Sequence, residues 1–124
     1  MMSHTILLVD DEDDIREVAQ LSLEMTAGWE VHAAGSGAEG IRKAREVRPD
    51  AILLDVMMPE MDGPATVRAL RADPETDSIP IILLTAKVQQ ADRQRFDGLG
   101  VQGVLNKPFD PMTLADQVSA VLGW

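Results

Sequence analysis

The sequence predicts an α/β fold: a doubly wound parallel sheet of five strands with five helices packed on its two faces. Short apolar runs alternate with helical segments along the chain, which is typical of βα repeats around a parallel sheet. Residues 51–54 and 79–84 are continuously apolar, as expected for strands covered on both faces. No repeat or linker divides the 124 residues, so we expect one domain over residues 1–124.

The first strand is predicted at residues 5–9. The acidic stretch 10–14 follows it and opens a helix, where the positive end of the helix dipole favours negative charge. We expect this helix to end at Gly28 and to turn an apolar stripe toward the sheet. The stripe consists of Ile15, Val18, Leu21 and Met25.

Residues 29–34 alternate in polarity, which predicts an edge strand with one wetter face. A turn at residues 35–37 leads into the second helix, and Pro49 marks the end of that helix. The inner face of this helix is predicted to contain Ile41, Ala44 and Val47.

The third strand, residues 51–54, is followed by a loop and by a helix that Pro64 can begin. Val67 and Leu70 are expected to face the sheet from this helix. The fourth strand occupies residues 79–84, because Pro80 is tolerated only at the start of such a strand.

A weakly amphipathic helix is predicted at about residues 88–97, and the other edge strand at residues 101–105. Pro111 is expected to open the last helix. Its apolar face is predicted to be Leu114, Val118, Val121 and Leu122.

The order of the strands follows from their polarity. The first, third and fourth strands are the most apolar and should be central, so right-handed crossovers favour the order 2-1-3-4-5. Open α/β sheets bind their ligands beyond the carboxyl ends of the strands, at the point where the order reverses. Here that point lies between the first and third strands.

Five polar side chains follow apolar runs and should gather at this edge of the sheet. Clustered carboxylates repel one another unless a cation compensates, and oxygen ligands without His or Cys favour Mg²⁺ or Mn²⁺ over zinc. A carboxylate can attack phosphorus, while a hydroxyl and an ammonium can bind the phosphoryl oxygens. Each residue alone would be ordinary, but together they predict a site for a metal ion and a phosphoryl group. The five are Asp10, Asp11, Asp55, Thr85 and Lys107.

Composition limits the function further. The net charge of -10 argues against direct nucleic-acid binding and against anionic membrane surfaces. The absence of cysteine excludes disulfides and thiolate metal sites. We see no signal peptide and no apolar run of the ~20 residues that span a bilayer, so we expect a soluble, cytoplasmic protein.

Five motifs, in order and each close to a predicted strand end, resemble the signature of response-regulator receiver domains of the single-domain, chemotaxis-regulator type. The resemblance covers essentially the whole chain and implies a flavodoxin-like fold. It also implies a two-component phosphorelay in which a histidine kinase or histidine phosphotransfer protein is the donor. The motifs are Val9-Asp10-Asp11-Glu12, Leu54-Asp55-Val56-Met57-Met58-Pro59, Asp62-Gly63, Leu84-Thr85-Ala86 and Lys107-Pro108-Phe109.

The resemblance implies a role for each site residue. Asp55 is the expected phosphoacceptor. Asp10 and Asp11 are expected to hold Mg²⁺, Asp11 directly and Asp10 partly through water, together with Asp55 and the backbone carbonyl of Met57. Met57 is also predicted to shield the phosphoryl group from water, so that Met57→Asn would speed autodephosphorylation.

The phosphoryl group is expected to be bound by Thr85, by the backbone N–H of Ala86 and by Lys107, and the Lys107-Pro108 bond is expected to be cis. Phosphorylation would then change how a partner protein binds to the face formed by the fourth helix, the fifth strand and the fifth helix. The protein is expected to be a monomer or a phosphorylation-dependent dimer. Val104 stands where the family often has an aromatic residue, which excludes an aromatic rotamer switch there.

Three other functions remain open. A metal-dependent phosphohydrolase with an aspartate nucleophile could use the D-x-D pattern Asp11-Glu12-Asp13, although the chain lacks room for a cap domain. A flavin mononucleotide binder needs a Gly- and hydroxyl-rich phosphate loop after the first strand, where this chain is acidic. A receiver-like partner-binding module that is not phosphorylated is disfavoured by the intact acidic set.

Overall fold

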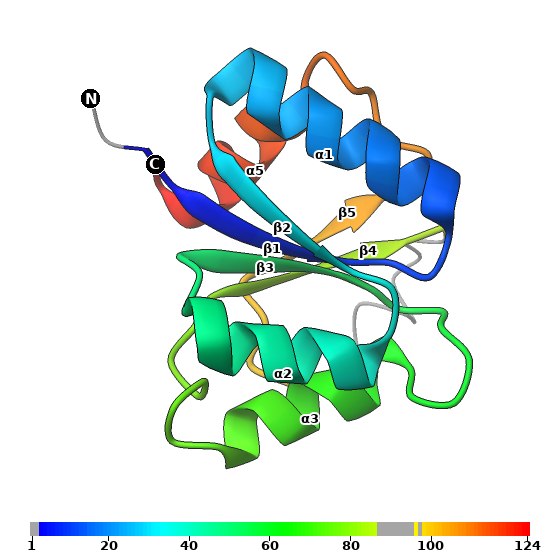
Figure 1. Ribbon diagram of the computed structural model, residues 1–124, viewed down its shortest axis with the longest axis vertical. Helices are drawn as coiled ribbons and strands as arrows, with labels where there is room; N and C mark the ends of the chain where they lie inside the picture. Colours follow the sequence, from blue (N-terminus) through cyan, green and yellow to red (C-terminus); the bar gives the residue numbers. More distant parts are fainter. Residues whose placement is uncertain (1–2, 87–95, 97) are drawn as a thin grey trace.

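The computed structural model describes residues 3–86, 96 and 98–124. Its centre is a five-stranded parallel sheet in the order β2-β1-β3-β4-β5, which confirms the predicted order and both predicted edges (Figure 1). The strands are β1 (Thr5–Val9), β2 (Glu30–Ala34), β3 (Ala51–Asp55), β4 (Ile81–Thr85) and β5 (Gly103–Asn106).

Helices cover both faces of this sheet. Figure 1 shows α1 and α5 on one face and α2 and α3 on the other. Apart from Phe96, which is buried, the helix predicted at about residues 88–97 lies outside the described residues. In the described part of the chain, no helix has the length and apolarity that crossing a membrane requires. The helices are α1 (Asp13–Ala27), α2 (Gly37–Val47), α3 (Gly63–Ala72) and α5 (Leu114–Leu122).

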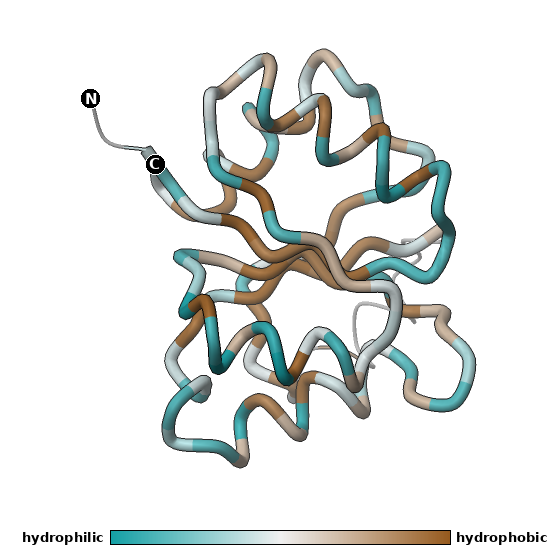
Figure 2. The backbone as a smooth tube through the Cα atoms, in the orientation of Figure 1, coloured by the Kyte–Doolittle hydropathy of each residue, from teal (hydrophilic) through white to brown (hydrophobic). Residues whose placement is uncertain are grey.

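The core has two layers because successive strand residues point to opposite faces of the sheet. In β1, Leu7 packs with the residues of α2 and α3, whereas Ile6 and Leu8 pack with those of α1 and α5. All five residues of β3 are buried, as are those of β4. Figure 2 shows the resulting apolar centre along the strands.

The predicted inner face of α1 is wrong. The side chains of Val18, Leu21 and Met25 are 44%, 56% and 81% exposed, whereas Ala19 and Leu23 are fully buried. The small Ala19 side chain lets the helix approach the sheet closely, and Leu23, one turn later, extends that face. An apolar stripe of α1 therefore faces outward.

Several element boundaries differ from the prediction because side chains cap the chain there. The Gln102 side chain accepts a hydrogen bond from the Ile81 N–H (2.7 Å). The segment before β5 therefore caps the first residue of β4, which begins at Ile81 and not at residue 79. Asp110 accepts from the Met112 N–H (2.9 Å) and forms a turn, so α5 begins at Leu114 and not at Pro111.

Three aromatic rings meet at the amino ends of the strands. The His4 imidazole stacks on Trp124 with ring centroids 3.6 Å apart and planes 6° apart. Trp29 contacts both rings edge-on, at 5.7 Å from His4 and 5.3 Å from Trp124. This ring cluster ties the two ends of the chain to the edge of the sheet, because His4 precedes β1 and Trp124 follows α5.

Candidate functional site

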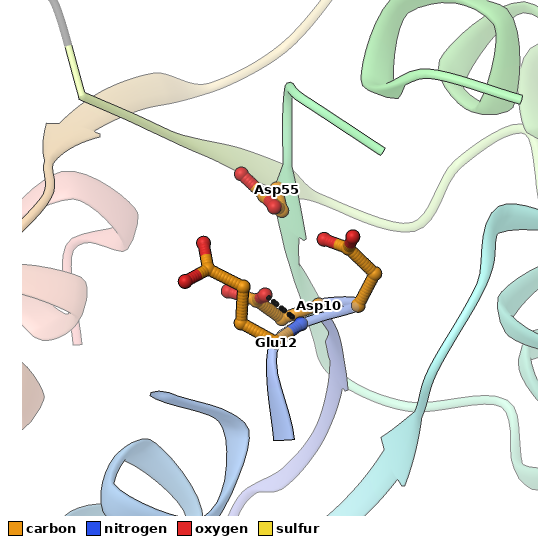
Figure 3. Close-up of side chains that lie close together, drawn as sticks. Asp10, Glu12 and Asp55 are labelled. Carbon is orange, nitrogen blue, oxygen red and sulfur yellow. Dashed lines mark hydrogen bonds between the residues drawn. The ribbon is translucent and has the colours of Figure 1, made fainter. Parts of the chain in front are cut away.

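Four carboxylates meet where the strand order reverses, beyond the ends of β1 and β3. One carboxylate oxygen from each lies within 4.8 Å of the others. Asp10 and Asp55 are buried, at 0% and 2% exposure, while Glu12 is exposed. Figure 3 shows the Asp10, Glu12 and Asp55 side chains around one common space. The carboxylates are those of Asp10, Asp11, Glu12 and Asp55.

Backbone hydrogen bonds fix the chain that carries these groups. The Asp10 N–H donates to the carbonyl of Ala34 in β2 (3.1 Å), which extends the β1 pairing to the site. The Glu12 N–H then donates to Asp10 Oδ1 (2.9 Å), and the chain turns into α1 (Figure 3). Arg16 donates from that helix to the Asp10 carbonyl (2.7 Å). The acidic residues thus belong to a rigid strand-to-helix turn.

Asp55 is held in place by the segment that follows it. The Val56 N–H donates to the Leu84 carbonyl of β4 (3.0 Å), and the Gly63 N–H donates to the Val56 carbonyl (2.9 Å). Gly63 packs so closely that a Cβ there would lie 2.8 Å from the Asp55 carbonyl oxygen. The first turn of α3 therefore supports the backbone of Asp55 directly.

Lys107 faces these carboxylates from the loop after β5. Its Nζ lies 2.9 Å from Asp10 Oδ2, 3.3 Å from Asp55 Oδ1 and 3.4 Å from Glu12 Oε1. The backbone N–H of Lys107 donates to the Thr85 carbonyl (2.9 Å), and the Lys107-Pro108 bond is cis, as expected. The side chain is only 9% exposed, so its ion pairs with Asp10 and Asp55 are largely shielded from water.

The environment shifts the pKa of both partners. Burial, followed by the charge of Asp10, raises the pKa of Asp55 to about 6, although Lys107 and the Met57 N–H oppose the shift. Burial lowers the pKa of Lys107, but its hydrogen bond to Asp10 and the charges of Asp10 and Asp55 outweigh that effect, so the pKa is raised. The site therefore holds more negative charge than Lys107 can neutralise.

The donor set fits a divalent cation. Asp11 Oδ1 and Asp55 Oδ2 are buried and have no hydrogen-bond partner among the described residues. An unsatisfied buried carboxylate oxygen is costly unless a cation or hydrogen-bond donor meets it. Because all the available side-chain ligands are carboxylate oxygens, the site suits Mg²⁺ or Mn²⁺ better than zinc.

Of the remaining predicted residues, Met57 and Ala86 line the space around these carboxylates, and Thr85 directly precedes Ala86. Thr85, the last residue of β4, is buried at 7% exposure. Met57 is 76% exposed, and its N–H donates to Asp55 Oδ1 at 3.4 Å. A cavity of about 270 Å³ is lined by Glu12, Ile15, Asp55, Met57, Ala86, Lys107 and Pro108.

Sequence reasoning missed Glu12 as a member of the carboxylate group. It directly follows Asp10 and Asp11 at the start of the helix, and this adjacency was the available signal. Chemically, the arrangement offers a carboxylate nucleophile, a cation site and an ammonium that can neutralise a transferring phosphoryl group.

The match to a family model and to solved structures agrees with this geometry. Residues 6–119 match the model of the response regulator receiver domain. The chain resembles the chemotaxis protein CheY4 of Vibrio cholerae, with a TM-score of 0.90 and 36% identity over 97% of this chain and 99% of that one. It also resembles the receiver domain of the sensor histidine kinase PA1611 of Pseudomonas aeruginosa, whose structure has a magnesium ion in the active-site cleft. That likeness has a TM-score of 0.86 and 32% identity over 99% of this chain and 100% of the other.

A curated relative extends beyond the similar region. The DNA-binding dual master transcriptional regulator RpaA of Synechocystis is 40% identical over 118 residues, which are 94% of this chain and 48% of RpaA. The chain spans about half the length of the curated relatives it matches. With the family model matched over most of its length and the acidic site formed at the carboxyl end of the sheet, the chain belongs to the response regulator receiver domain family.

Proposed function

We propose that Asp55 accepts a phosphoryl group from a phosphohistidine donor and that this modification controls partner binding. Receiver domains are signalling proteins of two-component systems and interact with histidine kinases. The observation that carries the proposal is Asp55 Oδ2, a buried and unpartnered carboxylate oxygen. It belongs to the carboxylate whose other oxygen lies 3.3 Å from Lys107.

In the transfer, an Asp55 carboxylate oxygen forms the bond to phosphorus while the donor's N–P bond breaks and its electron pair stays on the imidazole nitrogen. Lys107, the Thr85 hydroxyl and the Ala86 N–H bind the phosphoryl oxygens. Asp10, Asp11, Asp55 and the Met57 carbonyl would hold Mg²⁺, and the ion would supply positive charge to neutralise the transferring group.

We also propose that the protein is not an enzyme: it catalyses only its own phosphorylation and dephosphorylation. The proposal covers the whole chain, residues 1–124, as one receiver domain. It also includes a cytoplasmic location, because the donor kinase must itself be charged from ATP.

Acetyl phosphate with Mg²⁺ tests the acceptor, with the modified residue identified by mass spectrometry. We expect one phosphoryl group on Asp55, none in Asp55→Asn, and a strong loss in Asp11→Asn. Phosphate on Asp11 would instead support the phosphohydrolase alternative, and an unmodified protein would refute the proposal.

The donor protein is expected to dock beside the site on the outward apolar stripe of α1. A pocket of about 220 Å³ lies between α1 and the loop after β5, with a mostly apolar lining. For a donor histidine to reach Asp55, the protein that carries it must cover this pocket. Burial of the apolar lining of the pocket would then stabilise the complex. The pocket is lined by Asp14, Ile15, Val18, Lys107, Pro108 and Phe109.

Val18→Asn separates docking from chemistry. We expect it to slow phosphotransfer from a cognate histidine kinase at least several-fold and to leave phosphorylation by acetyl phosphate unchanged. Met112→Asn is the control, because Met112 is also an exposed apolar residue (75%) and does not line the pocket. Equal effects of the two variants on the kinase reaction would exclude this docking surface.

A further inference from the structure

Lys107 has three carboxylate partners, and an ammonium has only three N–H donors. The distances from Nζ are 2.9 Å to Asp10 Oδ2, 3.3 Å to Asp55 Oδ1 and 3.4 Å to Glu12 Oε1. A phosphoryl oxygen that binds Lys107 must therefore displace or share one of these contacts. Which contact is released depends on the cost of leaving each carboxylate without its cation.

Burial identifies Glu12 as the partner that is released. The side chains of Asp10 and Asp55 are 0% and 3% exposed, so until the bond from Asp55 to phosphorus forms, losing the ammonium would leave a buried charge unpaired, which is strongly destabilising. The Glu12 side chain is 58% exposed, and water can replace its contact at little cost. Its distance to Lys107 is also the longest of the three.

Glu12 also opposes an incoming anion by its charge. Its carboxylate belongs to the group whose oxygens lie within 4.8 Å of one another, so it repels a phosphoryl group at Asp55. The same charge attracts a divalent cation to the site. Glu12 should therefore have opposite effects on the two ligands.

We propose that Glu12 is a positioning residue that competes with the phosphoryl group for Lys107 and so restrains phosphorylation of the resting protein. It touches no reacting atom and is released when the phosphoryl oxygen takes its place on Lys107. The inference rests on the proposed acceptor function of Asp55.

Glu12→Gln tests the proposal because it removes the charge and keeps the shape. We expect roughly two- to fivefold faster phosphorylation by acetyl phosphate at saturating Mg²⁺, and tighter binding of beryllofluoride by a similar factor. Mg²⁺ affinity without a phosphoryl group, measured by calorimetry, should fall by a comparable factor. A variant that merely disturbed the site would weaken binding of both ligands.

Glu17→Gln is the matched control, because Glu17 lies exposed on α1 outside the carboxylate group and carries the same change. A Glu12→Gln protein that is phosphorylated no faster than Glu17→Gln, while wild type is modified on Asp55, would overturn this inference alone. Wild-type protein that is not modified on Asp55 would overturn the proposed function.

Discussion

Asp55 combines burial with the nearby charge of Asp10, which Lys107 compensates only in part, and both disfavour its ionised form. Its carboxylate shares Lys107 with Asp10, so a single ammonium serves two buried acids. Such a group is a poor stabiliser of the metal-free fold, but it is well prepared for a cation or a phosphoryl group. The proposed phosphoacceptor therefore reduces the stability of the metal-free protein when it is ionised.

The pH dependence of stability follows from the raised pKa of Asp55, which is about 6 against 3.8 for an ordinary aspartate. Between these values the folded protein binds more protons than the unfolded chain, so the free energy of unfolding falls as pH rises. Above pH 6 the ionised group costs up to about 3 kcal/mol. We expect metal-free Asp55→Asn to exceed wild type in stability by up to this amount at pH 7.5.

Urea unfolding at several pH values, in chelator, checks this expectation. The difference between Asp55→Asn and wild type should shrink toward zero near pH 4, where both side chains are uncharged in the folded protein. A difference that is constant from pH 4 to 8 would show that the raised pKa is not its cause.

At the scale of elements, the start of α3 supports the end of β3. A Cβ at Gly63 would lie 2.8 Å from both the Asp55 carbonyl oxygen and the Val56 Cα, which are backbone atoms that cannot move aside cheaply. We expect Gly63→Ala to reduce the free energy of unfolding by about 1–3 kcal/mol and to slow phosphorylation of Asp55. Gly98→Ala is the control, since no atom of the described residues lies within 4 Å of its Cβ position. Similar losses in both variants would contradict this role for Gly63.

The strand order could be predicted because it depends on the polarity of each strand, which can be read from that segment of the sequence alone. Residues 51–54 and 79–84 are apolar throughout and must be central. The inner face of α1 could not be predicted in the same way, because Val18 and Leu21 repeat at helical spacing as regularly as Ala19 and Leu23 do. Packing against the sheet decided between the two stripes, and the apolar side chains of Val18, Leu21 and Met25, which are exposed to water, misled the prediction.

The predicted site residues lie at one edge of the sheet because each ends a strand or follows its end within two residues, and parallel strands end at one edge. Glu12 escaped prediction because its position depends on the turn between β1 and α1. There, the Asp10 side chain binds the Glu12 N–H. Sequence patterns locate strand ends, but the direction of a side chain in a turn depends on such local hydrogen bonds.

At the scale of the whole molecule, a bound cation should stabilise the fold because the four carboxylates are brought together only when the chain folds. At a Mg²⁺ concentration of 100 times Kd, we expect the free energy of unfolding to rise by about 2.7 kcal/mol. Asp11→Asn should lose most of this gain, whereas Glu17→Gln should keep it. Urea unfolding with and without Mg²⁺ measures both, and an equal gain in the two variants would exclude Asp11 as a ligand.

The ring cluster gives the protein an optical reporter that is separated from its chemistry. Both tryptophans of the chain belong to it, and the five residues of β1 place the site roughly 17 Å away along the strand. Trp29 is almost fully buried, and Trp124 is held by His4. Their fluorescence emission should therefore change when the whole chain unfolds and should change little when Asp55 is phosphorylated. Tryptophan fluorescence can then report global stability while phosphorylation is measured by another method.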